Sequence, residues 1–135
     1  MYFTKRENIS LGKLWVWIHF RDQQIEGGSF DDLLRLWLSY YEAETPFTFV
    51  FDTNGLHKIP NPYLCIRMAL FIRELKKQQF QYLCASHIVI SQNILLKMLD
   101  VIFAIQGPVA PVHIYLTDAE ETWSPLLDPS SVILP

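Results

Sequence analysis

The segment Phe47-Thr48-Phe49-Val50-Phe51 constrains the fold of this chain most strongly, because it is apolar at nearly every position. A strand with one face in water alternates apolar and polar residues, whereas an unbroken apolar run is typical of a strand covered on both faces. Asp52 ends the run, and the loop Thr53–Pro60 leads to a helix with Asn61 as its cap and Pro62 at its first position. In α/β proteins, functional groups tend to follow the carboxyl end of such a strand. We therefore expect a site, if the chain has one, between Asp52 and the start of this helix.

The rest of the chain alternates strand-like and helix-like segments around this central strand. A helix-like segment follows Ser29 and ends before Pro46, and another begins after the cap Ser91 and stops at Gly107. The order predicts a single α/β domain with a mainly parallel sheet of four or five strands and alternating helices. We place this domain over residues 1–127 and a loose C-terminal tail over residues 128–135. The remaining elements that we expect are strands over residues 14–20, 82–90 and 112–116, a short strand over Tyr2–Thr4 with a reversal near Gly12, and a short helix over Ala119–Trp123.

Composition narrows the class of protein. The chain has 135 residues, is half hydrophobic, and carries a net charge of −3, which argues against nucleic-acid binding. No signal peptide is visible at the N-terminus, and no uncharged apolar run approaches the ~18 residues of a membrane span. We expect Cys65 and Cys84 to be buried free thiols in a reducing compartment, which favours a cytoplasmic location.

Sequence motifs for catalysis or for cofactor and metal binding are missing. His19, His57, His87 and His113 are far apart, and no pair has metal-ligand spacing, although His87 and His113 fall on predicted strands and can approach each other. The chain has neither a Gly-x-Ser-x-Gly nucleophile motif nor a glycine-rich phosphate loop. We therefore expect no cofactor, no metal and no enzymatic activity.

Asp52 is the most interesting carboxylate. The simpler interpretation is that its side chain accepts backbone N–H groups of the turn at residues 53–55. A catalytic alternative, which we rank last, uses Asp52 as a base near His57 and Asn61.

The predicted third helix has more apolar surface than one side of a sheet needs. From Ile94 to Ile105 only Lys97 and Asp100 are charged. A helix on a sheet needs an apolar stripe, not an apolar circumference. The surplus belongs under neighbouring helices, against another protein chain, or around an apolar ligand. Trp15 and Trp17 raise the same question for their face of the sheet, because exposed aromatic side chains there would mark a contact surface.

The order of elements resembles the STAS fold of bacterial anti-sigma-factor antagonists, over roughly Asn8 to Trp123. The local matches are the strand-loop-helix from Phe49 to Ala69 and the strand-helix from Ile88 to Phe103. The topologically related CRAL-TRIO lipid-carrier fold is a weaker resemblance. The Pro-Val-Ala-Pro-Val segment at residues 108–112 is also similar to an ending found in small proteins of large DNA viruses.

The STAS resemblance implies a motif Asp-Ser-Ser-Gly at the start of a helix, whose second Ser is phosphorylated by a partner kinase. A literal alignment puts Asp52-Thr53-Asn54-Gly55 on this motif, whereas apolar spacing puts Pro60-Asn61-Pro62-Tyr63 there. We prefer the second, which needs no gap and places the motif at the helix start. The acceptor position holds Asn54 or Pro62, so the phosphorylation switch does not transfer to this chain.

The sequence therefore predicts a non-enzymatic protein-interaction module with a STAS-like fold, which binds a protein partner or a second copy of itself. The alternative is a carrier or binder of a lipid-like apolar small molecule. The residues that we expect at the partner surface are Thr53, Asn54, His57, Lys58, Asn61, Tyr63, Ile94, Lys97, Met98 and Val101.

Overall fold

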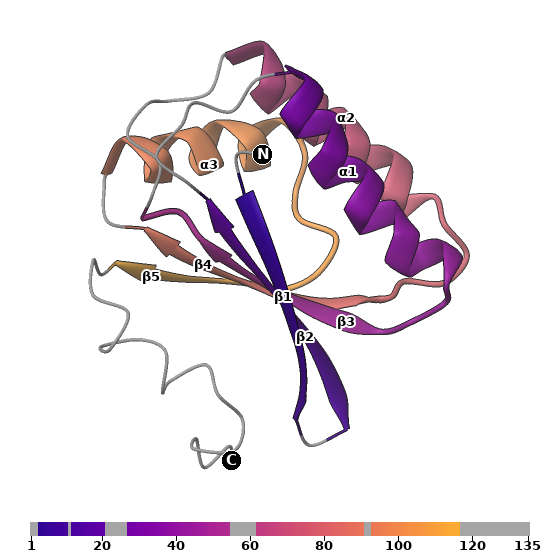
Figure 1. Ribbon diagram of the computed structural model, residues 1–135. Helices are drawn as coiled ribbons and strands as arrows, with labels where there is room; N and C mark the ends of the chain where they lie inside the picture. The colour runs from indigo at the N-terminus through magenta and orange to yellow at the C-terminus, as the bar shows by residue number, and fades with distance from the viewer. Residues whose placement is uncertain (1–2, 11, 21–26, 55–61, 91–92, 117–135) are drawn as a thin grey trace.

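Strands and helices alternate along the chain after an opening pair of antiparallel strands (Figure 1). The computed structural model describes residues 3–10, 12–20, 27–54, 62–90 and 93–116. This arrangement confirms the predicted α/β class. The elements in the described ranges are β1 (Phe3–Ser10), β2 (Lys13–Phe20), α1 (Gly27–Glu42), β3 (Phe47–Asp52), α2 (Pro62–Lys76), β4 (Leu83–Ile90), α3 (Asn93–Ile105) and β5 (Val112–Leu116).

The strands β2 to β5 lie where the sequence predicts them, to within one residue at each end. The N-terminal strand differs, because β1 runs from Phe3 to Ser10 and pairs with β2 along its whole length. Its charged run Lys5-Arg6-Glu7 conceals the strand pattern, and charged side chains are typical of an edge strand that faces water. Gly12, in the reversal, has a φ of 76°, which glycine adopts without steric cost. The following predictions lie outside the described residues: the caps Asn61 and Ser91, the helix Ala119–Trp123, the domain end at 127 and the tail 128–135.

The sheet has the strand order β1-β2-β3-β4-β5, so each strand lies beside its neighbours in sequence. Strand β1 is antiparallel to β2, and every other pairing is parallel, which makes the sheet mixed. Parallel strands joined by right-handed crossovers, always added at the same edge, place every connecting helix on the same face. Figure 1 shows α1, α2 and α3 together on one side of the sheet. None of these helices is long and apolar enough to cross a membrane.

The main core lies between this face of the sheet and the helices. Phe49 of β3 is fully buried, and the indole of Trp37 from α1 meets its ring edge to face, with the ring centres 5.1 Å apart. Burial of large aromatic side chains is the main stabilising contribution in such a layer. The central strand β3 therefore contributes fully buried side chains to the main core, as its unbroken apolar run predicts. Other members of this core include Val16, Ile18, Phe47, Ile88, Ile90 and Leu95.

A second, smaller apolar cluster covers the face of the sheet opposite the helices. It contains Trp15, Trp17, Val50 and Val89. Both indoles are buried, so the exposed aromatic surface considered for this face is not present. Trp17 Nε1 donates a hydrogen bond to Asn8 Oδ1 at 2.6 Å. This bond ties the aromatic cluster to the edge strand β1.

The expectation that both cysteines are buried is correct for Cys65 and wrong for Cys84, whose side chain is exposed. The register of the β3–β4 pair explains the difference. Phe47 pairs with Leu83 and Thr48 pairs with Ala85, so Cys84 is an extra residue between two paired positions. Such a bulge disrupts the alternation of side chains between the faces of a sheet. The sequence of the strand does not reveal it.

Candidate functional site

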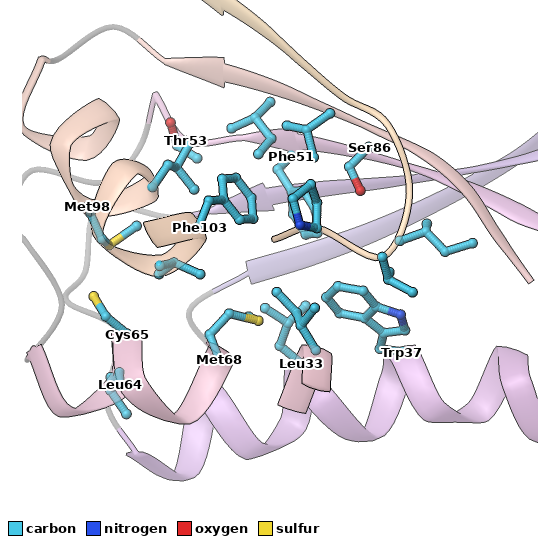
Figure 2. A pocket seen from close by; sticks show the side chains of 18 of the residues that line it. Leu33, Trp37, Phe51, Thr53, Leu64, Cys65, Met68, Ser86, Met98 and Phe103 are labelled. Carbon is cyan, nitrogen blue, oxygen red and sulfur yellow. The ribbon is translucent and has the colours of Figure 1, made fainter. Parts of the chain in front are cut away.

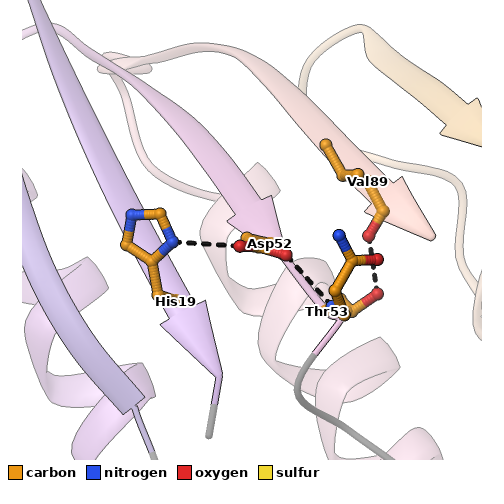
Figure 3. A network of polar contacts seen from close by, with 5 residues as sticks. His19, Asp52, Thr53 and Val89 are labelled. Atoms are coloured by element: carbon orange, nitrogen blue, oxygen red, sulfur yellow. Dashed lines mark hydrogen bonds and ion pairs between the residues drawn. The ribbon is translucent and has the colours of Figure 1, made fainter. Parts of the chain in front are cut away.

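His19 and Asp52 face each other at the carboxyl ends of β2 and β3, on the face opposite the helices (Figure 3). Their atoms Nδ1 and Oδ2 are 3.1 Å apart, and both side chains are partly buried. An ionised carboxylate only accepts hydrogen bonds, so the Nδ1–H group of His19 is the donor in its hydrogen bond to Asp52. The pairing fixes the orientation of the imidazole and leaves Nε2 as its second polar atom.

The turn after β3 is held by Asp52 and Thr53. Asp52 Oδ1 accepts the backbone N–H of Asn54 at 3.0 Å, which confirms the turn interpretation of this carboxylate. The carbonyl oxygen of Val89 accepts both the backbone N–H and the hydroxyl of Thr53, at 3.1 and 2.6 Å. The turn is therefore tied to β4, and Thr53 is buried.

A histidine oriented by a carboxylate is the arrangement that a general base needs. The hydroxyl next to Asp52 in sequence, that of Thr53, donates a hydrogen bond to the carbonyl oxygen of Val89 and not to His19. Within the residues that the structure describes, no group of three or more His, Cys, Asp or Glu side chains can hold a metal ion. The catalytic alternative with His57 and Asn61 lies outside those residues, and the observed partner of Asp52 is His19.

His87 and His113 come together on the same face of the sheet, as their strand positions suggest. Their rings stack with centres 4.9 Å apart, and His87 Nδ1 lies 3.0 Å from the hydroxyl oxygen of Tyr115. Trp15 stacks on the other side of His87, with a centre distance of 5.6 Å. Burial, with a further contribution from His113, lowers the pKa of His87 to about 4. His87 is therefore a partly buried side chain that is neutral at pH 7.

A cavity of about 140 Å³ lies on the opposite side of the sheet, between the strands and the three helices (Figure 2). Its walls come from every layer of the core. Figure 2 shows Leu33 and Trp37 of α1, Met68 of α2 and Met98 of α3 around the space below β3. The lining is almost entirely apolar. Apolar walls of this kind favour apolar molecules over water.

Two hydroxyl groups reach the cavity lining, those of Thr53 and Ser86. The Thr53 hydroxyl is bonded to Val89, as described above. Ser86 is paired in register with Phe49, so its side chain points to the helix-covered face (Figure 2). Its backbone N–H donates to Pro111, but within the described residues its hydroxyl forms no hydrogen bond. The Ser86 hydroxyl and the buried Nε1 of Trp37 are thus the polar groups of the lining that form no hydrogen bond within the described residues.

Helices α2 and α3 pack side by side through Cys65, Ala69, Ile72 and Ile102. Arg73 Nε donates to Gln106 Oε1 at 3.3 Å where the two helices end. On the side away from this core, both helices expose large apolar residues to water. We call these four residues the outer surface of α2 and α3; they are Ile66 (46% exposed), Leu70 (47%), Val101 (52%) and Ile105 (43%).

The residues expected at a partner surface separate into three groups. Tyr63, Lys97 and Val101 are exposed on α2 and α3, and Asn54 is half-buried in the turn. Thr53 and Met98 instead face inward and line the cavity. The side chains of His57, Lys58, Asn61 and Ile94 lie outside what the structure describes.

Sequence reasoning missed three features of these sites. Ile66 and Leu70 were not recognised, although their spacing of four residues on a predicted helix places them on one face. The pairing of His19 with Asp52 follows from aligning the ends of two neighbouring parallel strands. The cavity carries no sequence signal, because its lining residues are ordinary core residues from every layer.

Comparisons with protein-family models, with curated proteins and with solved structures find no match to this chain.

Proposed function

We propose that this chain is a non-enzymatic protein-interaction module that binds a second copy of itself through the outer surface of α2 and α3. The observation that carries the proposal is the exposure of four large apolar side chains on two adjacent helices. The spacing of four residues puts Ile66 with Leu70 on one face of α2, and Val101 with Ile105 on one face of α3. An apolar patch that is exposed on a monomer marks a contact surface. Other residues of the same helices already pack into the core on their inward sides. The four exposed residues are therefore not needed to bury the helices against the sheet.

Charges beside the outer surface favour a second copy as the partner. Arg73 and Glu74 are exposed on α2, and Lys97 and Asp100 are exposed on α3. A two-fold interface brings the same patch of both subunits together, so it requires a patch that is complementary to itself. A patch with both signs of charge meets this requirement, whereas a patch of one sign would repel its copy.

The small apolar area predicts a weak association. A stable interface of standard size buries about 800 Å² on each partner and includes roughly 20 to 30 residues a side. Four exposed apolar side chains supply the centre of a smaller contact. We therefore expect a dissociation constant on the order of micromolar, which corresponds to about −8 kcal/mol.

A STAS-like fold is part of this proposal. The mixed sheet with its antiparallel first strand, and the start of α2 at Pro62, support it. Pro62 is also where the preferred alignment expects the phosphorylated Ser, and proline has no hydroxyl to accept a phosphate. If the chain is STAS-like, its contacts are regulated by something other than phosphorylation at this position.

Nuclear magnetic resonance of methyl groups, over a dilution series, tests the self-association. The methyl signals of Ile66, Leu70, Val101 and Ile105 should shift with protein concentration in the micromolar to millimolar range. Ile9 is 76% exposed on β1 and is the matched control, because it lies outside the proposed interface. Concentration-independent signals for the four methyl-bearing residues would contradict binding to a second copy.

The alternative function, binding of a lipid-like molecule, has one observation in its favour, the apolar cavity. Sites for drug-sized ligands have volumes of roughly 300 to 1,000 Å³. The cavity of about 140 Å³ is smaller and suits a compact molecule better than an acyl chain.

A further inference from the structure

The cavity between the sheet and the helices has the size of a site for a single aromatic ring. An engineered protein cavity of about 150 Å³ with Leu, Ile and Phe walls binds benzene. The cavity in this chain has a volume of about 140 Å³ and comparable walls. Molecules much larger than one ring would have to displace the side chains that line the cavity.

The walls favour an aromatic ligand over an aliphatic one. Rings of Phe30, Trp37, Phe51 and Phe103 line the cavity. Aromatic pairs in edge-to-face or offset geometry gain about 0.5–1.5 kcal/mol beyond the burial of their area. Met68 and Met98 also line the space, and thioether sulfur makes favourable contacts with aromatic rings.

Ser86 adds one polar requirement. The residue is only 6% exposed, lines the cavity, and within the described residues its hydroxyl has no hydrogen-bond partner. A hydroxyl without an internal partner keeps both its donor and its acceptor capacity for a ligand. A buried water usually makes about three hydrogen bonds, and the surrounding walls offer too few polar groups for it. A ligand with one hydrogen-bonding group satisfies Ser86 while its ring fills the apolar space.

We propose that this cavity binds a monocyclic aromatic molecule with one hydrogen-bonding group, of the phenol class, and that the Ser86 hydroxyl contacts this group. The site uses the inward sides of α2 and α3. The proposed dimer uses their outer surface, so the two proposals do not depend on each other.

Methionine methyl signals give a direct test, because the chain has three methionines, Met1, Met68 and Met98. The protein is labelled with ¹³C at the methionine methyl groups and titrated with phenol, benzene or cyclohexanol. Phenol should shift the Met68 and Met98 signals saturably. Benzene, which lacks the hydroxyl, and cyclohexanol, which lacks the aromatic ring, should both bind more weakly than phenol.

The substitution Ser86→Ala separates the hydrogen bond from the fit of the ring. It should weaken phenol binding roughly threefold to tenfold and leave benzene binding unchanged, as expected for one neutral hydrogen bond. Ser39→Ala is the matched control, because Ser39 is exposed on α1 and bonded to Leu36. The proposal is overturned if neither phenol nor benzene shifts Met68 and Met98 saturably at millimolar concentration. It is also overturned if Ser86→Ala weakens the binding of benzene as much as it weakens the binding of phenol.

Discussion

His19 and Asp52 come from neighbouring parallel strands and hold each other in one orientation, with Nδ1 and Oδ2 3.1 Å apart. Asp52 also accepts the backbone N–H of Asn54, so one carboxylate fixes both a side chain and a turn. This double role explains why the strand ends in aspartate. It gives Asp52 a structural function that requires no chemistry at this edge of the sheet.

Replacing Asp52 should therefore lower stability in a graded way. Asp52→Ala removes the acceptor of two hydrogen bonds and should reduce the free energy of unfolding by about 1–3 kcal/mol. Asp52→Asn keeps one side-chain oxygen and should cost less. Urea unfolding measures both, with Glu42→Ala at the exposed end of α1 as the control, expected within about 0.5 kcal/mol of the wild type. Equal stability of Asp52→Ala and the wild type would contradict a structural role for Asp52.

Phe49 should be among the most sensitive positions of the core. Its side chain is fully buried and contacts the rings of Trp37, Phe47 and Phe51. Phe49→Ala should destabilise the fold by about 3–5 kcal/mol, because it removes buried area and leaves a void. Phe80→Ala is the matched control, since Phe80 is exposed and its loss should cost about 0.5 kcal/mol or less. Similar unfolding midpoints for the two variants would contradict the central place of β3.

The partly buried His87 predicts a dependence of stability on pH. Its pKa is about 4 in the folded chain and near 6.5 when unfolded, so between these values the unfolded chain binds more protons. The free energy of unfolding should therefore fall as the pH decreases from about 6.5 to about 4. The slope from this group is at most about 1.4 kcal/mol per pH unit, and solvent near the partly exposed ring reduces it.

The variant His87→Gln isolates this contribution, because the other ionisable groups are unchanged. The difference in stability between His87→Gln and the wild type should shift in favour of the variant as the pH falls from 6.5 to 4. A difference that is constant over this range would contradict the lowered pKa of His87 in the folded chain. Tyr115, whose hydroxyl contacts His87, provides a second check, since Tyr115→Phe should alter this dependence.

The two cysteines should differ in reactivity. Cys84 is exposed, whereas Cys65 is buried, and burial raises the pKa of the Cys65 thiol. Because the thiolate is the reactive form, a disulfide reagent should modify one thiol of the native protein quickly and the second only after unfolding. Cys84→Ser should abolish the fast reaction and Cys65→Ser should preserve it. Two fast thiols in the native protein would contradict the burial of Cys65.

Local patterns in the sequence are sufficient to predict most of the strands and helices of the fold. The unbroken apolar run at Phe47–Phe51 identified the central strand, and Pro62 marked the start of α2. Both signals come from residues near one another in sequence. The extent of β1 was underestimated because Lys5, Arg6 and Glu7 suit an edge strand exposed to water, and a charged run does not resemble a strand.

The candidate sites depended on contacts between distant residues, which local pattern does not contain. His19 and Asp52 are 33 positions apart, and their contact depends on the register of β2 against β3. The exposure of Cys84 depends on a bulge in the same way. The surplus apolar surface of the third helix was visible in the sequence, but only the packed structure separates Val101, which faces water, from Met98, which faces the cavity.

Sedimentation equilibrium of the wild type and two charge variants tests the central claim most directly. We expect the mass of the wild type to rise from that of one chain toward that of two over the micromolar range. Val101→Lys should keep the mass of one chain, because it places a charge at the centre of the interface. Ile9→Lys, at an exposed apolar position of β1, should associate like the wild type. A wild type that remains a single chain at every concentration, or equal association of both variants, would contradict dimerisation through the outer surface of α2 and α3.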